Sequence, residues 1–423
     1  MIKAIKGTKD IFDPEIEKWQ FLEEIVSDIF RNFNYSEIRT PVFEETSLFA
    51  RGIGESTDIV GKEMYTFTDR SGNSLTLKPE GTASVVRAVL EHSLYKSKPL
   101  NKFYYISPMF RQERPQAGRL RQFHQFGGEA LGSNHPYLDA EMILIPYVIL
   151  QSLGLSDFNV KLNSLGVPES REKYKAVLRE YLSDKVKDLS EESRRRFETN
   201  ILRIFDSKAE NDIRIMNEAP KILDYLSNED IDHLEEVKSI LDDAHIDYEI
   251  DEKLVRGLDY YTNTTFEIVS GSVGAQSALC GGGRYNLLSK QLGNADIPAV
   301  GFAAGIERIL LACKNEGLLK FEHFPLPLFV VLINKAYDRI AYNLALFFRG
   351  QGIETELDYL GRSVKAQMRE ANKNNAQFVL FVGGDEINDS MVTLKDMKSG
   401  QEEKYSFDSL EEIAEKIFLR NEE

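Results

Sequence analysis

The spacing of apolar residues divides the chain into regions with different expected structures. Apolar side chains recur every three to four residues across 16–33, which predicts a helix begun by Asp13-Pro14. Residues 35–42 read as extended and are interrupted by a proline. From 75 to about 132, short apolar runs alternate with glycine and proline, which predicts strands joined by turns.

The middle and the end of the chain differ from this pattern. Residues 168–245 are charged, follow a helical period and contain almost no glycine, and strand-rich sequence resumes at Tyr248, so we expect a helical insertion. Two prolines within 324–329 indicate a linker. Beyond it, strand and helix patterns alternate, which predicts a small α/β domain. Its expected strands are 326–333, 355–360, 376–384 and 390–397, and its expected helices are 338–350, 362–375 and 408–420.

Composition narrows the class of protein. The 423 residues are 42% hydrophobic and 28% charged, which is typical of globular proteins and excludes wholesale disorder. The longest apolar runs, 142–150 and 324–333, are about half of the ~20 residues that a membrane helix needs. The start of the chain has no secretory pattern, and Cys280 and Cys313 are too few for a disulfide framework or a cysteine-based zinc site. We therefore expect a cytoplasmic, reduced protein with no membrane partner and no metal site.

Charge gives two opposing indications. With 52 Lys plus Arg against 68 Asp plus Glu, the formal charge of −16 disfavours a nucleic-acid partner. Residues 111–121, however, hold four arginines and one glutamate, a local charge of +3. Because arginine binds phosphate bidentately, this cluster favours a phosphate-bearing ligand, although a solvated hairpin tip is an alternative. Residues 325–423, with 12 basic and 17 acidic side chains, give no such indication of RNA binding.

One strand pattern favours the ligand. Two β-rich runs within 103–132 flank the arginine-rich loop, which predicts a long-looped antiparallel hairpin. Alternate residues of a strand share a face. The shared face of the second run consists of Arg121, Phe123, Gln125, Gly127 and Glu129. This face would carry a cation, an aromatic ring, an amide and a carboxylate, with an open space where Gly127 has no side chain. Such a combination suits a surface that binds a ligand better than a surface in the core or in solvent.

Two further segments are open to more than one interpretation. Arg256 precedes an expected turn, and Tyr260 and Tyr261 begin an expected strand, but tyrosine pairs are also common in half-buried strands. The glycine-rich segment 279–288 resembles a phosphate-binding loop without matching the GxxxxGK[ST] pattern. Its glycines also suit a tight turn or a close backbone approach.

Residues 298–310 read as a helix. Gly301, Gly305 and Arg308 would then share one helix face, on which Arg308 is the only large side chain among the three. Such a face would present Arg308 to a site, or it would serve only to pack small residues closely.

Together these segments resemble a known family. FRQER…RLRQFHQFGGE resembles motif two of the class II aminoacyl-tRNA synthetases, GFAAGIERIL motif three, and the extended segment around Pro41 motif one. LVRGLDYYTNTTFE and LKPEGTASVVRA resemble the histidine-specific motifs of histidyl-tRNA synthetases. The resemblance implies an α+β fold with an antiparallel β-sheet flanked by helices. It also implies a catalytic domain over 1–324, with the helical insertion at about 168–245, and a C-terminal α/β anticodon-binding domain over 325–423.

The resemblance also implies an activity. A histidine–tRNA ligase activates L-histidine with ATP to histidyl-adenylate and pyrophosphate, with Mg²⁺ on the pyrophosphate oxygens. It then transfers histidine to the 3′ end of histidine tRNA. A homodimer formed through the motif-one region is implied as well. The helix with Arg362, Lys365 and Arg369 is either an anticodon-binding face or a solvated one.

Roles for individual residues follow from the resemblance alone. Arg111 would bridge the histidine carboxylate and the α-phosphate of ATP, and Arg256 would approach that phosphate from the other side; these two are the implied catalytic residues. The other implied ATP-binding residues are Glu113 at adenine, Phe123 beneath it, and Arg119 and Arg308 at the outer phosphates. Arg111 and Arg256 are also implied histidine-binding residues. The others are Glu80, Thr82 and Gln125 around the ammonium group, Glu129 and Tyr261 at the imidazole nitrogens, and Tyr260 nearby.

Two other functions compete with this one. A catalytically inactive paralogue serves as regulatory subunit of ATP phosphoribosyltransferase in histidine biosynthesis, but it typically lacks the anticodon-binding domain and has degraded motifs. Here residues 325–423 are present and Arg111, Arg256 and Arg308 are in place. A synthetase for another amino acid is disfavoured by the RGLDYY segment.

Overall fold

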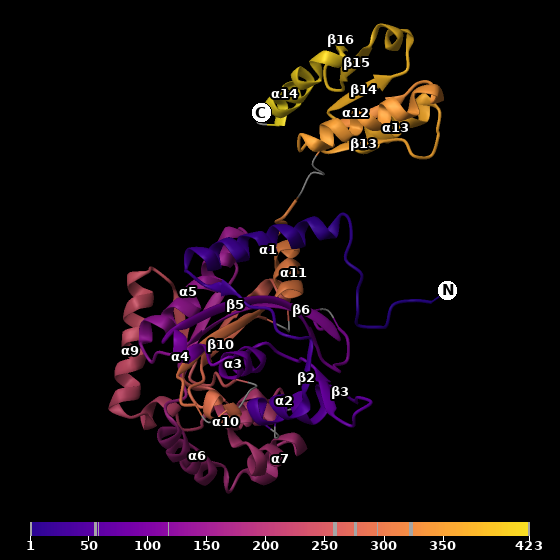
Figure 1. The fold of residues 1–423 in the computed structure, drawn as a ribbon. Helices are drawn as coiled ribbons and strands as arrows, with labels where there is room; N and C mark the ends of the chain where they lie inside the picture. The colour runs from indigo at the N-terminus through magenta and orange to yellow at the C-terminus, as the bar shows by residue number, and fades with distance from the viewer. Residues whose placement is uncertain are drawn as a thin grey trace. The chain divides into compact units, whose positions relative to one another are not determined.

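The computed structural model describes residues 2–54, 57, 59–116, 118–256, 260–274, 277–293, 295–320 and 325–421. The chain forms two compact units, Met1–Leu319 and Lys320–Glu423. The expected domain boundary at 324/325 adjoins residues 321–324, which lie outside the described residues. Figure 1 shows both units, each with its own sheet and helices.

The larger unit is built on a mostly antiparallel sheet of eight strands in the order β1-β5-β6-β11-β10-β9-β7-β8. The strands are β1 Ser36–Glu37, β5 Asn101–Phe110, β6 Gln122–Leu131, β7 Asn159–Ser164, β8 Tyr248–Ile250, β9 Thr262–Val269, β10 Ala278–Arg284 and β11 Ala299–Gly305. Only the outer pairs β1–β5 and β7–β8 are parallel. A small second sheet has the order β2-β4-β3, with β2 Phe43–Glu45, β3 Tyr65–Thr68 and β4 Ser74–Leu77.

Helices cover both faces of the large sheet. They are α1 Glu15–Asn32, α2 Thr46–Ile53, α3 Thr82–Glu91, α4 Leu94–Ser97, α5 Pro136–Ser152, α10 Leu288–Gly293 and α11 Ile306–Asn315. The apolar sides of α1 and α5 meet one face of the sheet around Phe126 and Phe302. On the other face α3 packs near Tyr105 and Tyr285, so two separate cores enclose the sheet. Figure 1 shows α1 and α5 on the opposite side of β5 and β10 from α3.

The helical insertion is present where it is predicted. It contains α6 Pro168–Leu182, α7 Glu191–Thr199, α8 Glu210–Asn217, α9 Asn228–Asp243 and the 3-10 turn η3 Ile201–Asp206. Strand β8 begins at Tyr248, as expected. Buried side chains of α6, α8 and η3 share a core with Tyr260 and Tyr261. Helix α9 instead buries Leu234, Val237 and Leu241 in the core that contains α1 and α5.

The expectation of a single helix over 298–310 is wrong. Residues 299–305 form strand β11, and the helix α11 begins only at Ile306. Val300, Phe302 and Ala304 alternate along β11 and are almost completely buried, which is the period of a strand. Gly301 leaves room for the Glu129 carboxylate on the neighbouring strand, a close approach that only glycine allows. Gly301, Gly305 and Arg308 therefore do not share a helix face.

Other expectations need smaller corrections. Of the interpretations of the glycine-rich segment 279–288, close backbone approach is confirmed: its three glycines lie in the central strand β10, not in a phosphate-binding loop, and neighbouring atoms come close to each of them. Within 35–42 only Ser36 and Glu37 form a strand. Helix α1 starts at Glu15, one residue after Pro14.

The smaller unit has a five-stranded sheet in the order β13-β12-β14-β15-β16. Its elements are β12 Leu328–Leu332, α12 Asp338–Gly350, β13 Thr355–Leu357, α13 Val364–Lys373, β14 Phe378–Val382, β15 Met391–Asp396, β16 Glu402–Ser406 and α14 Leu410–Asn421. Successive residues of β12 enter different cores, with α12 and α14 on one face of the sheet and α13 on the other. The edge strand β16 was not expected, because its polar, largely exposed sequence lacks the apolar alternation of a strand.

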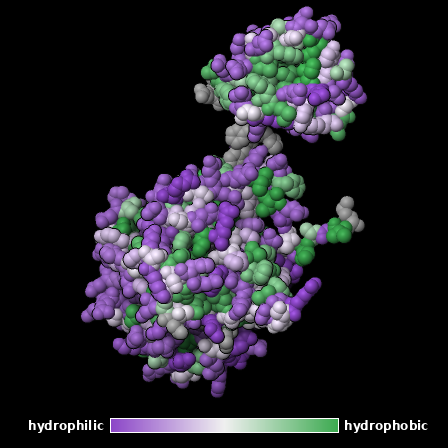
Figure 2. All heavy atoms as spheres, in the orientation of Figure 1, coloured by the Kyte–Doolittle hydropathy of each residue, from purple (hydrophilic) through white to green (hydrophobic). Residues whose placement is uncertain are grey.

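The surfaces of the two units differ in the view of Figure 2. Hydrophilic residues cover most of the visible face of the larger unit, while apolar residues gather on the visible face of the smaller one. None of the helices in the described parts of the chain combines the length and apolar character of a membrane span.

Candidate active site

One cavity on the sheet face beside α3 brings the predicted residues together. It is lined by Glu80, Thr82, Arg111, Glu113, Arg119, Phe123, Gln125, Arg256, Tyr260, Tyr261 and Arg308. Glu129 is fully buried and lies deeper, where Thr82 connects it to the cavity wall through a hydrogen bond. The turn expected directly after Arg256 falls on residues 257–259, which lie outside the described residues.

The β5–β6 hairpin supplies one wall of the cavity. The two strands are antiparallel, with Asn101 opposite Leu131 and Phe110 opposite Gln122, as the sequence predicts. Phe123 and Gln125 face the cavity along β6. A side chain at Gly127 would lie 2.5 Å from the Tyr105 hydroxyl oxygen, so glycine is needed to admit that ring.

Arg121 departs from the predicted ligand-lined face. It stands just before β6, and its backbone N–H donates to the Gly7 carbonyl at 2.7 Å. Its side chain packs against the same N-terminal glycine, so it contacts the N-terminal segment.

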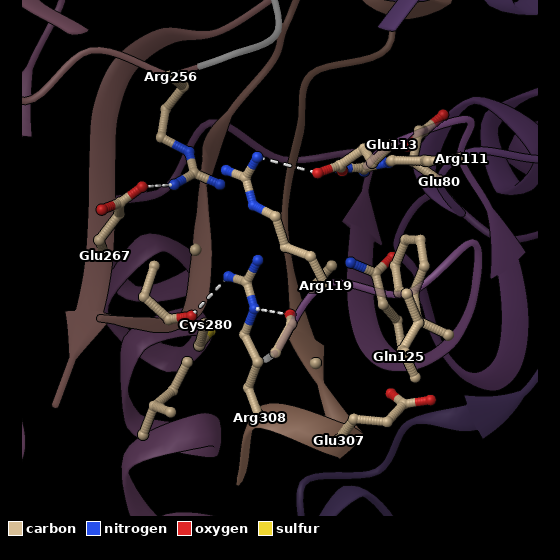
Figure 3. A pocket seen from close by; sticks show the side chains of 18 of the residues that line it. Glu80, Arg111, Glu113, Arg119, Gln125, Arg256, Glu267, Cys280, Glu307 and Arg308 are labelled. Atoms are coloured by element: carbon tan, nitrogen blue, oxygen red, sulfur yellow. Dashed lines mark hydrogen bonds and ion pairs between the residues drawn. The ribbon is translucent and has the colours of Figure 1, made fainter. Parts of the chain in front are cut away.

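Arginines from three segments meet in the cavity, as Figure 3 shows. Arg111 donates from Nε to the Pro79 carbonyl at 3.0 Å, and its guanidinium carbon lies 5.2 Å from the centre of the Phe123 ring. Arg119 pairs with Glu113, with 2.9 Å between Nη1 and Oε2. The cations are thus held by neighbouring backbone, ring and carboxylate groups before any ligand arrives.

Arg256 reaches the cavity from the opposite wall. It pairs with Glu267 of β9, and Gly281 of β10 leaves the space that its guanidinium occupies. Burial is the largest influence and opposes the charged form, but Glu267, Tyr261 and Cys280 together outweigh it and raise the pKa of Arg256. Arg256 therefore stays charged and is aimed toward Arg119 in Figure 3.

Arg308 lies at the first turn of α11. Its Nε donates to the Gly118 carbonyl at 3.0 Å and its Nη1 to the Ala278 carbonyl at 2.9 Å. Burial, with the nearby charges of Arg119 and Arg111, lowers the pKa of Arg308. Cations that repel one another in a buried place are stabilised by an anion between them, so this end of the cavity suits phosphate.

Carboxylates and hydroxyls occupy the other end. Glu80 accepts hydrogen bonds from the backbone N–H groups of Thr82 (2.7 Å) and Ala83 (2.9 Å), which caps the start of α3 while the side chain still faces the cavity. Burial raises the pKa of Glu80, although these two hydrogen bonds oppose the shift. Glu80 is therefore both a helix cap and a cavity residue.

Glu129 is surrounded by hydroxyl groups. It accepts from Thr82 Oγ1 at 2.6 Å and from the Tyr285 hydroxyl. Burial raises the pKa of Glu129 to about 8. The hydrogen bonds from Thr82 and Tyr285 oppose this rise, and the nearby Glu80 adds to it. The empty protein therefore holds this carboxyl group protonated for much of the time at neutral pH.

Several cavity residues were not predicted. Glu267, Glu307, Tyr105 and Tyr285 all contribute to the site or support it. The Tyr105 hydroxyl and the Gln125 Oε1 atom are buried without a hydrogen-bond partner among the described residues. Because Gln125 lines the cavity, its Oε1 atom is available to a ligand. A lone acid in the otherwise uncharged strand 262–269 was the one sequence signal for Glu267. The tyrosines could not be distinguished from core residues.

Comparison with known proteins identifies the class and then the family. The mostly antiparallel sheet with an arginine-lined cavity is the fold of a class II aminoacyl-tRNA synthetase. A family described as histidyl-tRNA synthetase matches residues 7–309, and one described as anticodon binding domain matches 328–417. This chain belongs to the histidyl-tRNA synthetase family.

Relatives match over nearly their whole length. Histidine–tRNA ligase of Halothermothrix orenii is 48% identical over 416 residues, which cover 98% of this chain and 99% of that protein. The enzyme of Caldanaerobacter subterraneus subsp. tengcongensis is 46% identical over 415 residues, 97% and 99% of the two chains. The crystal structure of apo S. aureus histidyl-tRNA synthetase has a TM-score of 0.82 and 38% identity, covering 98% and 99%.

The comparisons also bear on the alternative function. A structure described as an ATP phosphoribosyltransferase regulatory subunit/histidyl-tRNA synthetase from Bacillus halodurans matches at 21% identity and a TM-score of 0.64, a likeness of fold alone. The full-length ligases match far more closely, and both the catalytic and the anticodon-binding families are matched. The enzyme is favoured over the regulatory paralogue.

Proposed function

We propose that this chain is a histidine–tRNA ligase that uses the cavity to bind histidine and ATP side by side. The observation that carries the proposal is the division of one cavity into an arginine-rich end and an end with buried carboxyl and tyrosine groups. The first end suits a triphosphate and a carboxylate, and the second suits an amino acid with a polar ring.

In the first step a histidine carboxylate oxygen attacks the α-phosphorus of ATP. A new P–O bond forms, the bond to the bridging oxygen breaks, and pyrophosphate leaves with that electron pair. Two anions must approach each other, so the barrier falls when fixed cations lie beside the reacting oxygens. Arg111 and Arg256, held on opposite walls by Pro79 and Glu267, fill this role.

ATP occupies the arginine-rich end. The Phe123 ring, already beneath the Arg111 guanidinium, offers a flat face for adenine, and Glu113 accepts from its amino group. Arg119 and Arg308 contact the outer phosphates, and Arg119 exchanges part of its pairing with Glu113 for phosphate. Mg²⁺ is part of the proposal: it would accompany ATP and neutralise part of the phosphate charge beside Arg119 and Arg308.

Histidine occupies the other end. Glu80, Thr82 and Gln125 surround its ammonium group, and the unpartnered Gln125 Oε1 is an acceptor for it. Imidazole has one donor and one acceptor, which Glu129 and the Tyr261 hydroxyl satisfy together. The Tyr260 ring, 4.7 Å from the Tyr261 ring between centroids, closes the pocket beside it.

The second step transfers histidine to the terminal adenosine of histidine tRNA. The smaller unit binds the anticodon in this proposal, supported by the family match over 328–417. Of the basic residues of α13 and its approach, Arg362 is paired with Asp358 and Glu370, so Lys365 and Arg369 are the better candidates to contact RNA. The enzyme works in the cytoplasm as a homodimer in this proposal. The exposed Phe43 and Phe67 rings, which contact each other edge to face, provide an apolar surface for the second copy.

Arg256→Ala tests the assignment of this arginine. Because its charge is needed where negative charge develops, the rate of histidine-dependent ATP–pyrophosphate exchange should fall roughly 10²–10³-fold. Histidine binding, measured by calorimetry without ATP, should change much less. Arg31→Ala, which removes an exposed arginine paired with Asp28, is the matched control and should leave both unchanged. Equal losses of exchange and of histidine binding in Arg256→Ala would mean that Arg256 is structural.

A further inference from the structure

The helical insertion holds the backbone of the segment that carries Arg256 and Tyr261. Arg171, in the first turns of α6, donates from Nη1 to the Tyr261 carbonyl at 2.6 Å. Arg203 in η3 donates from Nη1 to the Arg256 carbonyl at 3.4 Å. Both ends of the 256–261 segment are therefore bonded to the insertion.

A third contact continues the attachment into strand β9. Asn263 donates from Nδ2 to Asp230 of α9 at 2.9 Å. The buried Asp230 carboxylate also accepts from Ser170 Oγ at 2.6 Å and from the Val167 N–H at 3.1 Å. This network fixes the start of α6 against α9, and Arg171 follows Ser170 directly, so its guanidinium projects from an anchored point.

Tyr261 depends on such support because of its place in the chain. Strand β9 begins at Thr262, so the Tyr261 carbonyl precedes the regular ladder of the sheet. Its side chain is buried in the proposed histidine pocket. A carbonyl that is fixed by a charged donor fixes the peptide plane and with it the direction of the side chain.

Arg171 belongs to a row of cations that lines a second cavity. Arg171, Lys175 and Arg179 recur at every fourth position of α6 and line a second cavity, together with Arg203. Arg256 and Tyr261 form its common wall with the first cavity. On the wall that the two cavities share, the Arg171 guanidinium donates to the Tyr261 carbonyl at 2.6 Å.

We propose that Arg171 is a positioning residue for histidine recognition: it holds Tyr261 in place, and through it the insertion sets the affinity of the catalytic unit for histidine. The proposal rests on the proposed role of Tyr261 at the imidazole. Arg171 touches no reacting atom, so its loss acts on the binding of the amino acid rather than on ATP.

The test compares Arg171→Ala with Arg171→Lys and with Arg179→Ala in the full-length enzyme. Arg179→Ala removes an equal charge from the same helix face and serves as the control. In histidine-dependent ATP–pyrophosphate exchange, Arg171→Ala should raise the KM for histidine about tenfold, the loss expected for one charge-assisted hydrogen bond. The KM for ATP should change less than about twofold, Arg171→Lys should restore part of the loss, and Arg179→Ala should match the wild type.

Three outcomes would overturn the proposal. They are an unchanged KM for histidine in Arg171→Ala, equal rises for histidine and ATP, and an equal effect of Arg179→Ala, which would indicate cavity charge alone. Tyr261→Phe separates this failure from that of the proposed site. If Tyr261→Phe raises the KM for histidine and Arg171→Ala does not, only the positioning role is wrong; if neither does, the assignment of Tyr261 is wrong as well.

Discussion

Glu129 shows how burial and hydrogen bonding combine at a single residue. Its carboxyl group is fully buried, which raises its pKa to about 8, yet Thr82 and Tyr285 both point hydroxyl donors at it. Donors favour the ionised form. An imidazole N–H would be a third donor, so histidine binding should complete the ionisation of Glu129.

This coupling predicts a pH dependence. Below about pH 8 the empty site carries a proton on Glu129 that must leave when histidine binds, so affinity weakens as the pH falls. The KM for histidine, measured by pyrophosphate exchange at saturating ATP, should rise roughly fivefold from pH 8 to pH 7. Protonation of free histidine adds a further rise below about pH 6.5.

The control is Glu129→Gln, which has no carboxyl proton to lose. Its KM for histidine should be higher throughout and should lack the step between pH 7 and pH 8. A KM that instead rises above pH 8 in the wild type would mean that protonated Glu129 donates to the imidazole, contrary to this account.

At the residue level, the sequence predicts part of the lining of the cavity. Strand alternation predicted that Phe123, Gln125 and Glu129 share a face, and the cavity and the buried carboxyl beneath it confirm that pattern. It failed for Arg121, because the N-terminal segment pairs with the backbone there. Tyr105 and Tyr285 were missed because only the packing of distant strands brings them to Gly127 and Glu129.

At the level of elements, the glycines of β10 leave space for two different neighbours. A side chain at Gly281 would collide with the end of the flexible Arg256 side chain, whereas one at Gly283 would collide with the backbone of Thr264 and Thr265. A flexible side chain can move aside, but a strand backbone cannot.

The two alanine variants should therefore behave differently. Gly281→Ala should displace the Arg256 guanidinium and reduce pyrophosphate exchange roughly 10²-fold, with the free energy of unfolding changed by less than about 1 kcal/mol. Gly283→Ala should cost about 1–3 kcal/mol in urea denaturation through overpacking. If Gly281→Ala keeps full exchange activity, the position of Arg256 is not critical for activation.

The neighbouring strand β11 shows where a sequence pattern alone predicts the wrong element. Residues 299–305 contain small residues at a spacing that also suits a helix, and periodicity cannot decide between a helix and a buried strand in so short a run. The run forms a strand because it pairs with β6, with Gly301 opposite Glu129. By contrast, the long amphipathic α12 has the predicted bounds, because its thirteen residues give a clear helical period.

At the level of the whole molecule, net charge and local charge play separate parts. The formal charge of −16 governs solubility and long-range repulsion, while the arginines of the cavity act at contact distance. Both units have closed cores of their own, so the larger one does not depend on the smaller one for its packing.

A chain ending near residue 326 should therefore keep histidine-dependent pyrophosphate exchange. Its kcat/KM for tRNA in an aminoacylation assay should fall about 100-fold or more, because one of two linked RNA contacts is lost. The full-length chain is the control for both assays. An unchanged kcat/KM for tRNA would mean that residues 328–417 do not bind the anticodon.

The most direct test of the account is ATP–pyrophosphate exchange by the full-length protein with each of the twenty amino acids in turn. A site that satisfies both imidazole nitrogens rejects side chains without them strongly, so exchange with histidine should exceed exchange with any other by ~10⁴ or more. Equal exchange with threonine, proline or glycine would contradict the assigned specificity. No exchange with any amino acid would contradict the ligase activity and would favour the function of the regulatory paralogue instead.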